Sequence, residues 1–326
     1  MTGLDDAALL AVVAIGSALG ASALGRASWP RRSPAAAILL WQALGLASGL
    51  AAVGTLLGLA MPASSIGVVR SALRVGMLFR TGGLFRVAGA FGATGTVPTI
   101  VVAVRLTCLA AGLILLASLC WVLVAARVAA VQARRRQRAL LTLLAHGDPK
   151  VPGALVVDYP TAAAYCLPGL RSQIVVSVGT LELLGRGELA AVLAHERAHL
   201  RERHDLVLLP FTALRRAFPK SATCADAQHA VALLVEMLAD DRALRTRQTR
   251  ELVSALVRFG TAGTCPAPAG ALAVGGAAGG TVGGGEVAAR VTRLLQPVRP
   301  LPSAAVAAIC FAAVLLIAAP VTLLVI

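Results

Sequence analysis

Aromatic and charged side chains are scarce in this sequence. Of its 326 residues, 4% are aromatic and 14% are charged, whereas 58% are hydrophobic. A soluble globular domain is about 25% charged and about 45–50% apolar. The shortage of charge excludes an ordinary soluble globule, and the hydrophobic excess excludes an intrinsically disordered chain. The composition is typical of a protein that places part of its length in a bilayer.

Acidic residues and lysine are also few. The chain has 15 Asp and Glu against 30 Lys and Arg, a net charge of +15, and lysine occurs only at Lys150 and Lys220. We interpret the preference for arginine as compositional bias. With so few aromatic residues, the positive charge indicates loops beside a membrane, and we expect no direct binding of nucleic acid. The arginines of residues 134–138 fit an anchor at the end of a span better than a set of phosphate contacts.

Cysteine pairs with the spacing of a metal or disulfide site are absent. None of the six cysteines stands in a C-x-x-C pair, so neither a disulfide framework nor a thiolate zinc site is indicated. A secretory signal is missing as well, because Asp5 and Asp6 stand where a basic region is required. We therefore expect the first apolar run to stay in the protein.

Long uncharged runs are present instead. A bilayer core of about 30 Å needs roughly 20 apolar residues in a helix, and a buried helix of a soluble domain is usually shorter. Four segments are long enough, and we predict that all four span the membrane: residues 7–25, 35–59, 106–126 and 304–326.

Basic residues in the short flanks predict the orientation of these spans. They stand between the first two spans, after the third and before the fourth, at Arg26, Arg31, Arg32, Arg127, residues 134–138, Arg290, Arg293 and Arg299. These flanks all lie on the same side of the membrane, which we assign to the cytoplasm of a multi-pass protein of the cell membrane. Both termini are then outside. The external loop 62–99 carries four arginines of its own, and its Gly-rich pattern is typical of a segment lying on the bilayer surface.

Residues 128–259 are predicted to form one cytoplasmic domain. A helix over 129–144 leads out of the third span, and short β-branched runs predict strands at 154–157, 162–166 and 174–178. Apolar periodicity predicts helices ending at His199 and covering 225–245 and 250–259. Residues 260–300 are predicted to be a Gly/Ala-rich linker followed by a basic amphipathic segment at 286–295.

The motif His195-Glu196-Arg197-Ala198-His199 lies on the first of these helices. Histidines at i and i+4 share one helix face, where both imidazoles can bind a Zn²⁺ ion, and the adjacent Glu196 can act as general base. A catalytic zinc needs a third protein ligand and an open position for water. Glu236 is the best candidate because it interrupts an apolar helical face. Asp240, one turn further on, can accept a hydrogen bond from a ligating imidazole. The alternative for both acids is a solvated helix edge.

Three further histidines have simpler interpretations. His204, followed by Asp205, is more typical of a hydrogen-bonding arrangement at a helix terminus than of catalysis. His229 lies on roughly the same helix face as Glu236 and could approach the metal, but a partly exposed helix position is favoured. His146 is expected in a loop.

The motif H-E-x-x-H followed by E-x-x-x-D resembles the gluzincin metallopeptidases of the HtpX and CAAX-protease kind. The order of three spans, a protease domain and a fourth span is similar to the BlaR/MecR antirepressor family of integral membrane peptidases, as are the sequences of residues 163–169, 174–177 and 195–200. The resemblance implies an α-helical membrane protein with four transmembrane helices and a cytoplasmic α+β gluzincin-like zinc metallopeptidase domain between the third and fourth. The receptors of that family continue into a penicillin-binding sensor domain, and no S-x-x-K, S-D-N or K-T-G set is present here. We therefore do not expect covalent sensing of a β-lactam.

By this resemblance, His195, His199 and Glu236 bind zinc and Glu196 is the general base. The strand around Tyr165 would pair with an extended protein substrate, and Tyr165 itself is a candidate for stabilising the oxyanion. The implied substrate is a winged-helix repressor of the BlaI/MecI type, and a homodimer is allowed for. Two alternatives stay open: an HtpX-like quality-control protease, and a non-catalytic signalling protein of the membrane that keeps a structural zinc.

Overall fold

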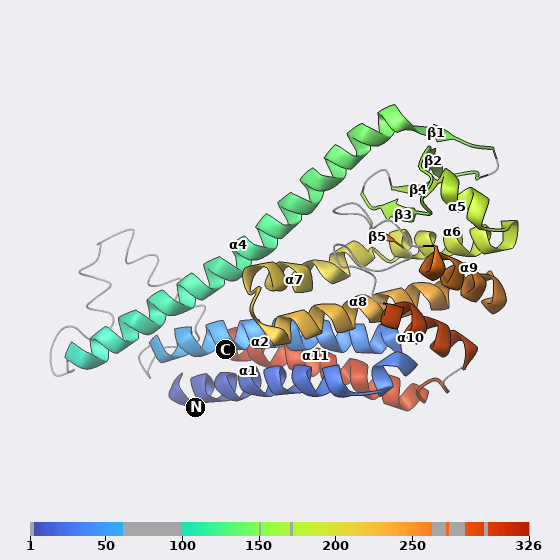
Figure 1. Cartoon of the computed structure of the whole chain (residues 1–326). Coiled ribbons are helices and arrows are strands. Elements are labelled where there is room, and N and C mark those ends of the chain that lie inside the picture. Colours follow the sequence, from blue (N-terminus) through green and yellow to red (C-terminus); the bar gives the residue numbers. More distant parts are fainter. Residues whose placement is uncertain are drawn as a thin grey trace. The chain divides into compact units, whose positions relative to one another are not determined.

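The computed structural model of the chain describes residues 3–60, 99–149, 151–169, 172–262, 272–273, 284–296 and 299–325. The expected external loop 62–99, except for Thr99, and most of the expected linker lie outside these residues. The helices are α1 (Gly3–Arg26), a 3₁₀ turn η1 (Trp29–Arg32), α2 (Pro34–Ala60), α4 (Thr99–Leu144), α5 (Val178–Leu183), α6 (Arg186–Arg201), α7 (His204–Ala217), α8 (Ala222–Ala243), α9 (Thr249–Thr261), α10 (Gly284–Leu295) and α11 (Ser303–Val325) (Figure 1). The strands are β1 (Ala145–Gly147), β2 (Leu155–Val157), β3 (Ala164–Leu167), β4 (Gln173–Ser177) and β5 (Leu272–Ala273).

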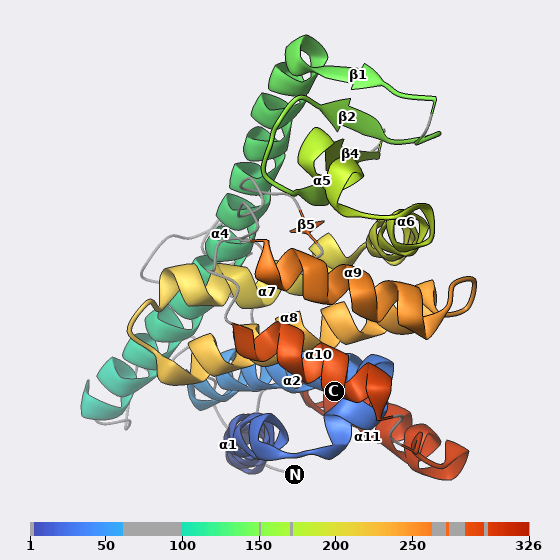
Figure 2. The same ribbon diagram turned by 45° about the vertical axis from the view of Figure 1, so that its right-hand side comes forward.

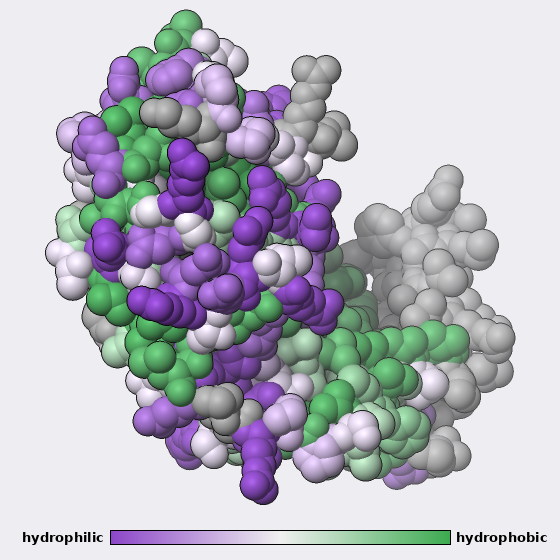
Figure 3. Space-filling view, turned by 90° about the vertical axis from the view of Figure 1, so that its right-hand side faces the viewer, coloured by the Kyte–Doolittle hydropathy of each residue, from purple (hydrophilic) through white to green (hydrophobic). Residues whose placement is uncertain are grey.

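The chain divides into two compact units. One contains Met1–Ala27, Leu39–Val122 and Ser303–Ile326, and the other contains Ser28–Ile38 and Leu123–Pro302. Four described helices are long and apolar enough to cross a membrane, namely α1, α2, α4 and α11. This number agrees with the four runs expected from the sequence, whereas their topology in a bilayer stays a prediction. The face seen in Figure 3 carries densely hydrophilic areas as well as contiguous hydrophobic ones, as expected for a chain that meets both water and lipid.

Small residues bring the helices of the first unit close together. A Cβ atom at Gly58 of α2 would lie 3.2 Å from Cβ of Ala7 on α1, and one at Gly54 would lie 2.9 Å from a methyl group of Leu324 on α11. Close packing of this kind is the main attraction between helices in lipid, where burial of apolar surface gives no advantage.

The second unit is built around a mixed five-stranded sheet in the order β1-β2-β4-β3-β5. β2 and β4 are parallel, and the other neighbouring pairs are antiparallel. The two faces of β3 have different neighbours because side chains alternate along a strand. Tyr165 and Leu167 pack with Leu141 of α4 on one face. Ala164 belongs to a core on the other face, which continues into α6, α9 and α10.

The helices of this unit form layers beside the sheet. α6 contacts β3 and β4, α9 and α8 contact α6, and α10 contacts both α8 and α9 (Figure 2). The core between them contains the buried side chains of Val192, Leu252, Leu256, Phe259 and Leu294. Leu294 comes from α10, so the amphipathic segment expected at 286–295 packs within this unit and supplies part of its core.

The expected strands and helices are found with shifts of a few residues, and five further elements were not predicted. These are η1, β1, α5, α7 and β5. β1 and β5 are too short to produce a periodic signal. α7 follows α6 almost directly because Arg203 adopts a left-handed conformation with φ 52°, which turns the chain between the two helices. The sequence has no glycine or proline at this turn, so it gives no sign that one helix ends and another begins there.

Gly179 in α5 provides a test of the packing between this helix and the preceding loop. Its N–H donates to the Tyr159 carbonyl oxygen at 3.0 Å, and a Cβ atom would lie 2.6 Å from the Pro160 carbonyl carbon. We expect Gly179→Ala to lower the free energy of unfolding by about 1–3 kcal/mol, since the backbone must shift.

The matched control is Gly147→Ala, because nothing lies within 4 Å of a Cβ atom there. Denaturant titration of both variants in detergent measures the difference. Equal stability of the two variants would contradict the packing described.

Candidate active site

α6 carries His195, Glu196 and His199 into the interior of the second unit. The helix begins at a capped turn, in which the Glu188 carboxylate accepts a hydrogen bond of 2.8 Å from the Gly185 N–H. The side chains of His195, Glu196 and His199 are fully buried. As the i, i+4 spacing predicts, both imidazoles point the same way, and their Nε2 atoms are 3.0 Å apart.

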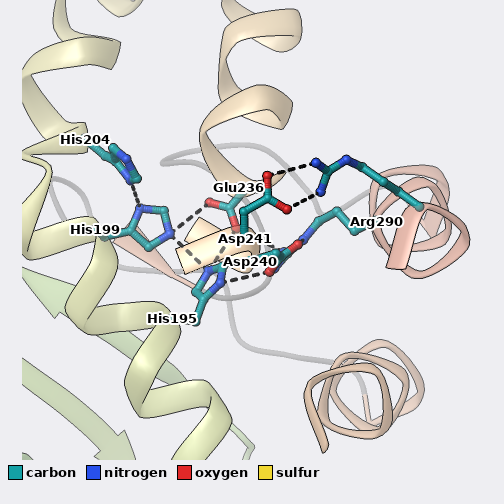
Figure 4. A network of polar contacts seen from close by, with 8 residues as sticks. His195, His199, His204, Glu236, Asp240, Asp241 and Arg290 are labelled. Atoms are coloured by element: carbon teal, nitrogen blue, oxygen red, sulfur yellow. Dashed lines mark hydrogen bonds and ion pairs between the residues drawn. The ribbon is translucent and has the colours of Figure 1, made fainter. Parts of the chain in front are cut away.

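Glu236 on α8 completes a possible metal-binding group. Its Oε2 atom lies 3.3 Å from Nε2 of His195, and its Oε1 atom lies 3.5 Å from Nε2 of His199 (Figure 4). One ligand atom from each of the three residues lies within 4.8 Å of the others, and all three residues are buried. Two imidazole nitrogens and a carboxylate oxygen form a donor set that zinc takes in catalytic sites.

Glu196 lies next to His195 on α6, and its carboxylate has no strong partner in the part of the chain that the structure describes. Both of its carboxylate oxygens are buried, and among the described residues neither has a hydrogen-bond donor at good geometry. The Cys166 thiol is close but is only a weak donor. Burial raises the pKa of Glu196 to about 8, although the charge of His195 and the thiol lower it. A buried carboxylate without a strong partner is costly, so the residues present fit a hydrolytic metal site in which Glu196 would accept a proton.

Each imidazole of this group has a partner at its second nitrogen. Nδ1 of His195 is 3.0 Å from Oδ1 of Asp240, the contact predicted for that residue. Nδ1 of His199 is 2.9 Å from Nδ1 of His204, the first residue of α7. Partners of this kind fix the tautomer and the orientation of a metal-binding histidine.

His204 is itself held in place. Its Nε2 atom lies 3.5 Å from the Glu202 carboxylate, which in turn binds Arg242 of α8. The next residue, Asp205, is buried and forms an ion pair of 3.0 Å with Arg134 of α4. The start of α7 is therefore attached to both α8 and α4, and the turn at Arg203 brings His204 back onto the face of α6 that carries His195 and His199.

The two imidazoles differ in their electrostatic surroundings. Burial alone would lower the pKa of His195, but Asp240 and Glu236 raise it to about 9. Burial lowers the pKa of His199 well below its usual value, and the neighbouring charges of His195 and His204 lower it further. The surrounding carboxylates thus favour the protonated form of His195. Metal binding must displace such a proton, since imidazole binds metal in its neutral form.

Arg290 of α10, like His204, was not predicted at this site from the sequence. Its guanidinium is buried and contacts both acids of α8, at 2.6 Å from Oδ1 of Asp240 and 3.0 Å from Oε2 of Glu236. Burial tends to raise the pKa of Asp240, but Arg290 holds it well below its usual range. In the sequence, Arg290 stands on the apolar side of an amphipathic segment, which could have indicated a buried position. We instead counted it among the basic residues that flank the fourth span.

Three other candidate residues lie elsewhere. The Tyr165 hydroxyl accepts a hydrogen bond of 3.0 Å from Gln137 of α4, on the face of β3 that points away from α6. The structure therefore does not bring Tyr165 to the metal group, and its predicted role at the oxyanion has no geometric support. His229 is two-thirds exposed and pairs with Glu286 at 3.0 Å. His146 is exposed in β1.

The edge of β3 that was expected to receive substrate is occupied by the chain itself. β5 pairs with it in antiparallel fashion, with Tyr165 opposite Ala273 and Cys166 opposite Leu272. β5 also contacts α6. An extended substrate can use this edge only in place of β5.

The contact between His204 and His199 can be tested by substitution. We expect His204→Phe to weaken zinc binding by about 10–100-fold, because His199 loses the group that fixes its orientation. Competition with a chelator of known affinity measures the change. His229→Phe is the matched control and should bind zinc like the wild type. Unchanged affinity in His204→Phe would show that this contact does not position the ligand.

Comparison with known proteins gives a family match over part of the chain. No curated protein and no solved structure matches it. Residues 113–251 match the model of Peptidase family M48. This range contains His195, Glu196, His199 and Glu236 and ends before Arg290. The match and the buried His-His-Glu group together support a metallopeptidase of this broad family.

Proposed function

We propose that the protein is a zinc endopeptidase of the cell membrane that hydrolyses peptide bonds on the cytoplasmic side. One observation carries the proposal: the Nε2 atoms of His195 and His199 converge with the Glu236 carboxylate, while the buried Glu196 carboxylate beside them has no strong partner. A structural zinc site is usually closed by four protein ligands. Three ligands next to an unused base fit a hydrolytic site better.

The residues have separate roles in this reaction. His195, His199 and Glu236 would hold the zinc ion, which supplies Lewis-acid chemistry by polarising a carbonyl and lowering the pKa of water. Glu196 removes a proton from the attacking water and later delivers it to the leaving amine. Its pKa of about 8 before metal binding shows that burial already favours proton uptake by this carboxylate. Asp240 and His204 keep the two imidazoles oriented.

The proposed location rests on the apolar helices and their flanks. Four described helices have the length and composition of spans, and the basic residues gather at the ends assigned to the cytoplasm. In this arrangement the peptidase unit lies between the third and the fourth span, on the cytoplasmic side.

For the substrate, we propose a winged-helix repressor of the BlaI/MecI type. The support is the resemblance to the antirepressor family in the motif and in the order of spans. Quality control of membrane proteins, as in HtpX-like enzymes, is the second candidate, because membrane spans would keep the site near such substrates. A non-catalytic zinc protein is disfavoured, since it would have no use for a buried Glu196.

Metal content and activity of two variants test the reaction. We expect one zinc per wild-type chain, loss of zinc in His195→Ala, and retention of zinc in Glu196→Gln. Peptidase activity on an unstructured protein should fall by about 10²–10⁴-fold in Glu196→Gln, because proton transfer is lost. Elemental analysis and a cleavage assay measure these effects. A wild-type protein without zinc, or a fully active Glu196→Gln variant, would refute the proposed function.

Comparing two strains tests the substrate. Cells with Glu196→Gln and cells lacking the gene should accumulate the same uncleaved proteins, because both lack the peptidase reaction. One soluble DNA-binding protein among them would support repressor cleavage. Accumulation of many membrane proteins would instead favour quality control. A deletion phenotype that Glu196→Gln complements fully would favour the non-catalytic alternative.

A further inference from the structure

Arg290 is a charged side chain in an unusual place. It is 1% exposed and is among the largest fully buried side chains of the described chain. Burying a guanidinium costs several kcal/mol unless charged partners compensate for the lost water. Its partners must therefore account for its position.

The partners are two carboxylates one turn apart on α8. Arg290 binds Asp240 through two parallel hydrogen bonds, Nε to Oδ2 at 2.9 Å and Nη2 to Oδ1 at 2.6 Å. Its third nitrogen, Nη1, lies 3.0 Å from Oε2 of Glu236. The planar guanidinium thus fixes both carboxylates relative to each other, which a lysine ammonium cannot do in the same way.

Both carboxylates act on the metal-binding atoms. Glu236 is itself a member of the ligand group, and its other oxygen, Oε1, faces His199. Oδ1 of Asp240 accepts from Arg290 and also lies 3.0 Å from Nδ1 of His195. One arginine therefore contacts a ligand directly and reaches a second ligand through one carboxylate (Figure 4).

We propose that Arg290 is a positioning residue of the metal centre, and that α10 is therefore part of the zinc site. The inference rests on the proposed function and adds a residue from outside the range matched by the family model. Arg290 fixes the Glu236 carboxylate beside the Nε2 atoms of His195 and His199, and it holds Asp240 against His195. It does not touch substrate.

Charge and geometry make opposite predictions for this residue. A positive charge close to the metal opposes cation binding, so removing it at fixed geometry would strengthen zinc binding. If Arg290 acts by positioning, removing it lets Glu236 and Asp240 separate, and zinc binding weakens. The direction of the change therefore distinguishes the two effects.

The chain offers a matched control on the same two helices. Arg293, one turn further along α10, binds Asp241 through two hydrogen bonds of 2.7 Å and 2.9 Å. This pair is also bidentate, through Nη1 and Nη2, but Asp241 makes no described contact with His195, His199 or Glu236. Loss of Arg293 removes a link of the same kind between α8 and α10, together with the hydrogen bond from its Nε to the Arg31 carbonyl oxygen, and leaves Asp240 and Glu236 with their partners.

The experiment measures zinc affinity of the full-length protein by chelator competition in the variants Arg290→Met, Arg290→Lys and Arg293→Met. We expect affinity to fall by about 10–100-fold in Arg290→Met. Arg290→Lys keeps the charge but loses the fork, so its affinity should fall as well. Arg293→Met should stay within about threefold of the wild type. The visible spectrum of the cobalt-substituted protein, which reports ligand geometry, should change in both Arg290 variants and not in Arg293→Met.

The outcomes separate this inference from the proposed function. A wild type that binds no zinc would overturn both. A wild type that binds zinc, with equal or tighter binding in Arg290→Met, would overturn only the role of Arg290. If Arg290→Met does not fold, Arg290→Lys decides: an affinity and a cobalt spectrum equal to those of the wild type would overturn the inference, and a weaker affinity with a changed spectrum would support it.

Discussion

The arrangement of the second unit depends on removing ionisable side chains from water around one point between α6 and α8. His195, Glu196, His199, Glu236 and Asp240 are all almost completely buried. Each charge placed in such surroundings must meet an opposite charge, a hydrogen-bond partner or a metal ion. This requirement explains why helices that are distant in the sequence send polar side chains to the same place.

The contacts that compensate these buried charges form two series, and each series begins at one histidine. On one side, His195 is followed by Asp240 and Arg290; on the other, His199 is followed by His204, Glu202 and Arg242. Both series end at an arginine, and each arginine belongs to a different helix from the histidine that it supports. Orientation of the ligands is thus built into the packing of α7, α8 and α10 around α6, and it is available before any ion binds.

The sequence predicts the local part of this site and misses the part that depends on tertiary folding. His195 and His199 are visible because four residues make one helical turn, and Glu236 is visible because a carboxylate interrupts an apolar face. His204 and Arg290 are not, because their positions depend on a left-handed residue at 203 and on the docking of a distant helix. Tyr165 shows a further limit of prediction from the sequence. Neighbouring strand residues point to opposite faces, and no local pattern shows which face of β3 meets α6.

The paired arginines of α10 have a consequence for how the chain can vary. Arg290 and Arg293 are three residues apart and meet Asp240 and Asp241, which are adjacent on α8. Two forks at this spacing fix both the rotation of α10 about its axis and its position along α8. One inserted residue between them would turn the second arginine by about 100° away from its carboxylate. The two helices therefore fit in a single register, and this register fixes the spacing of the two arginines within α10.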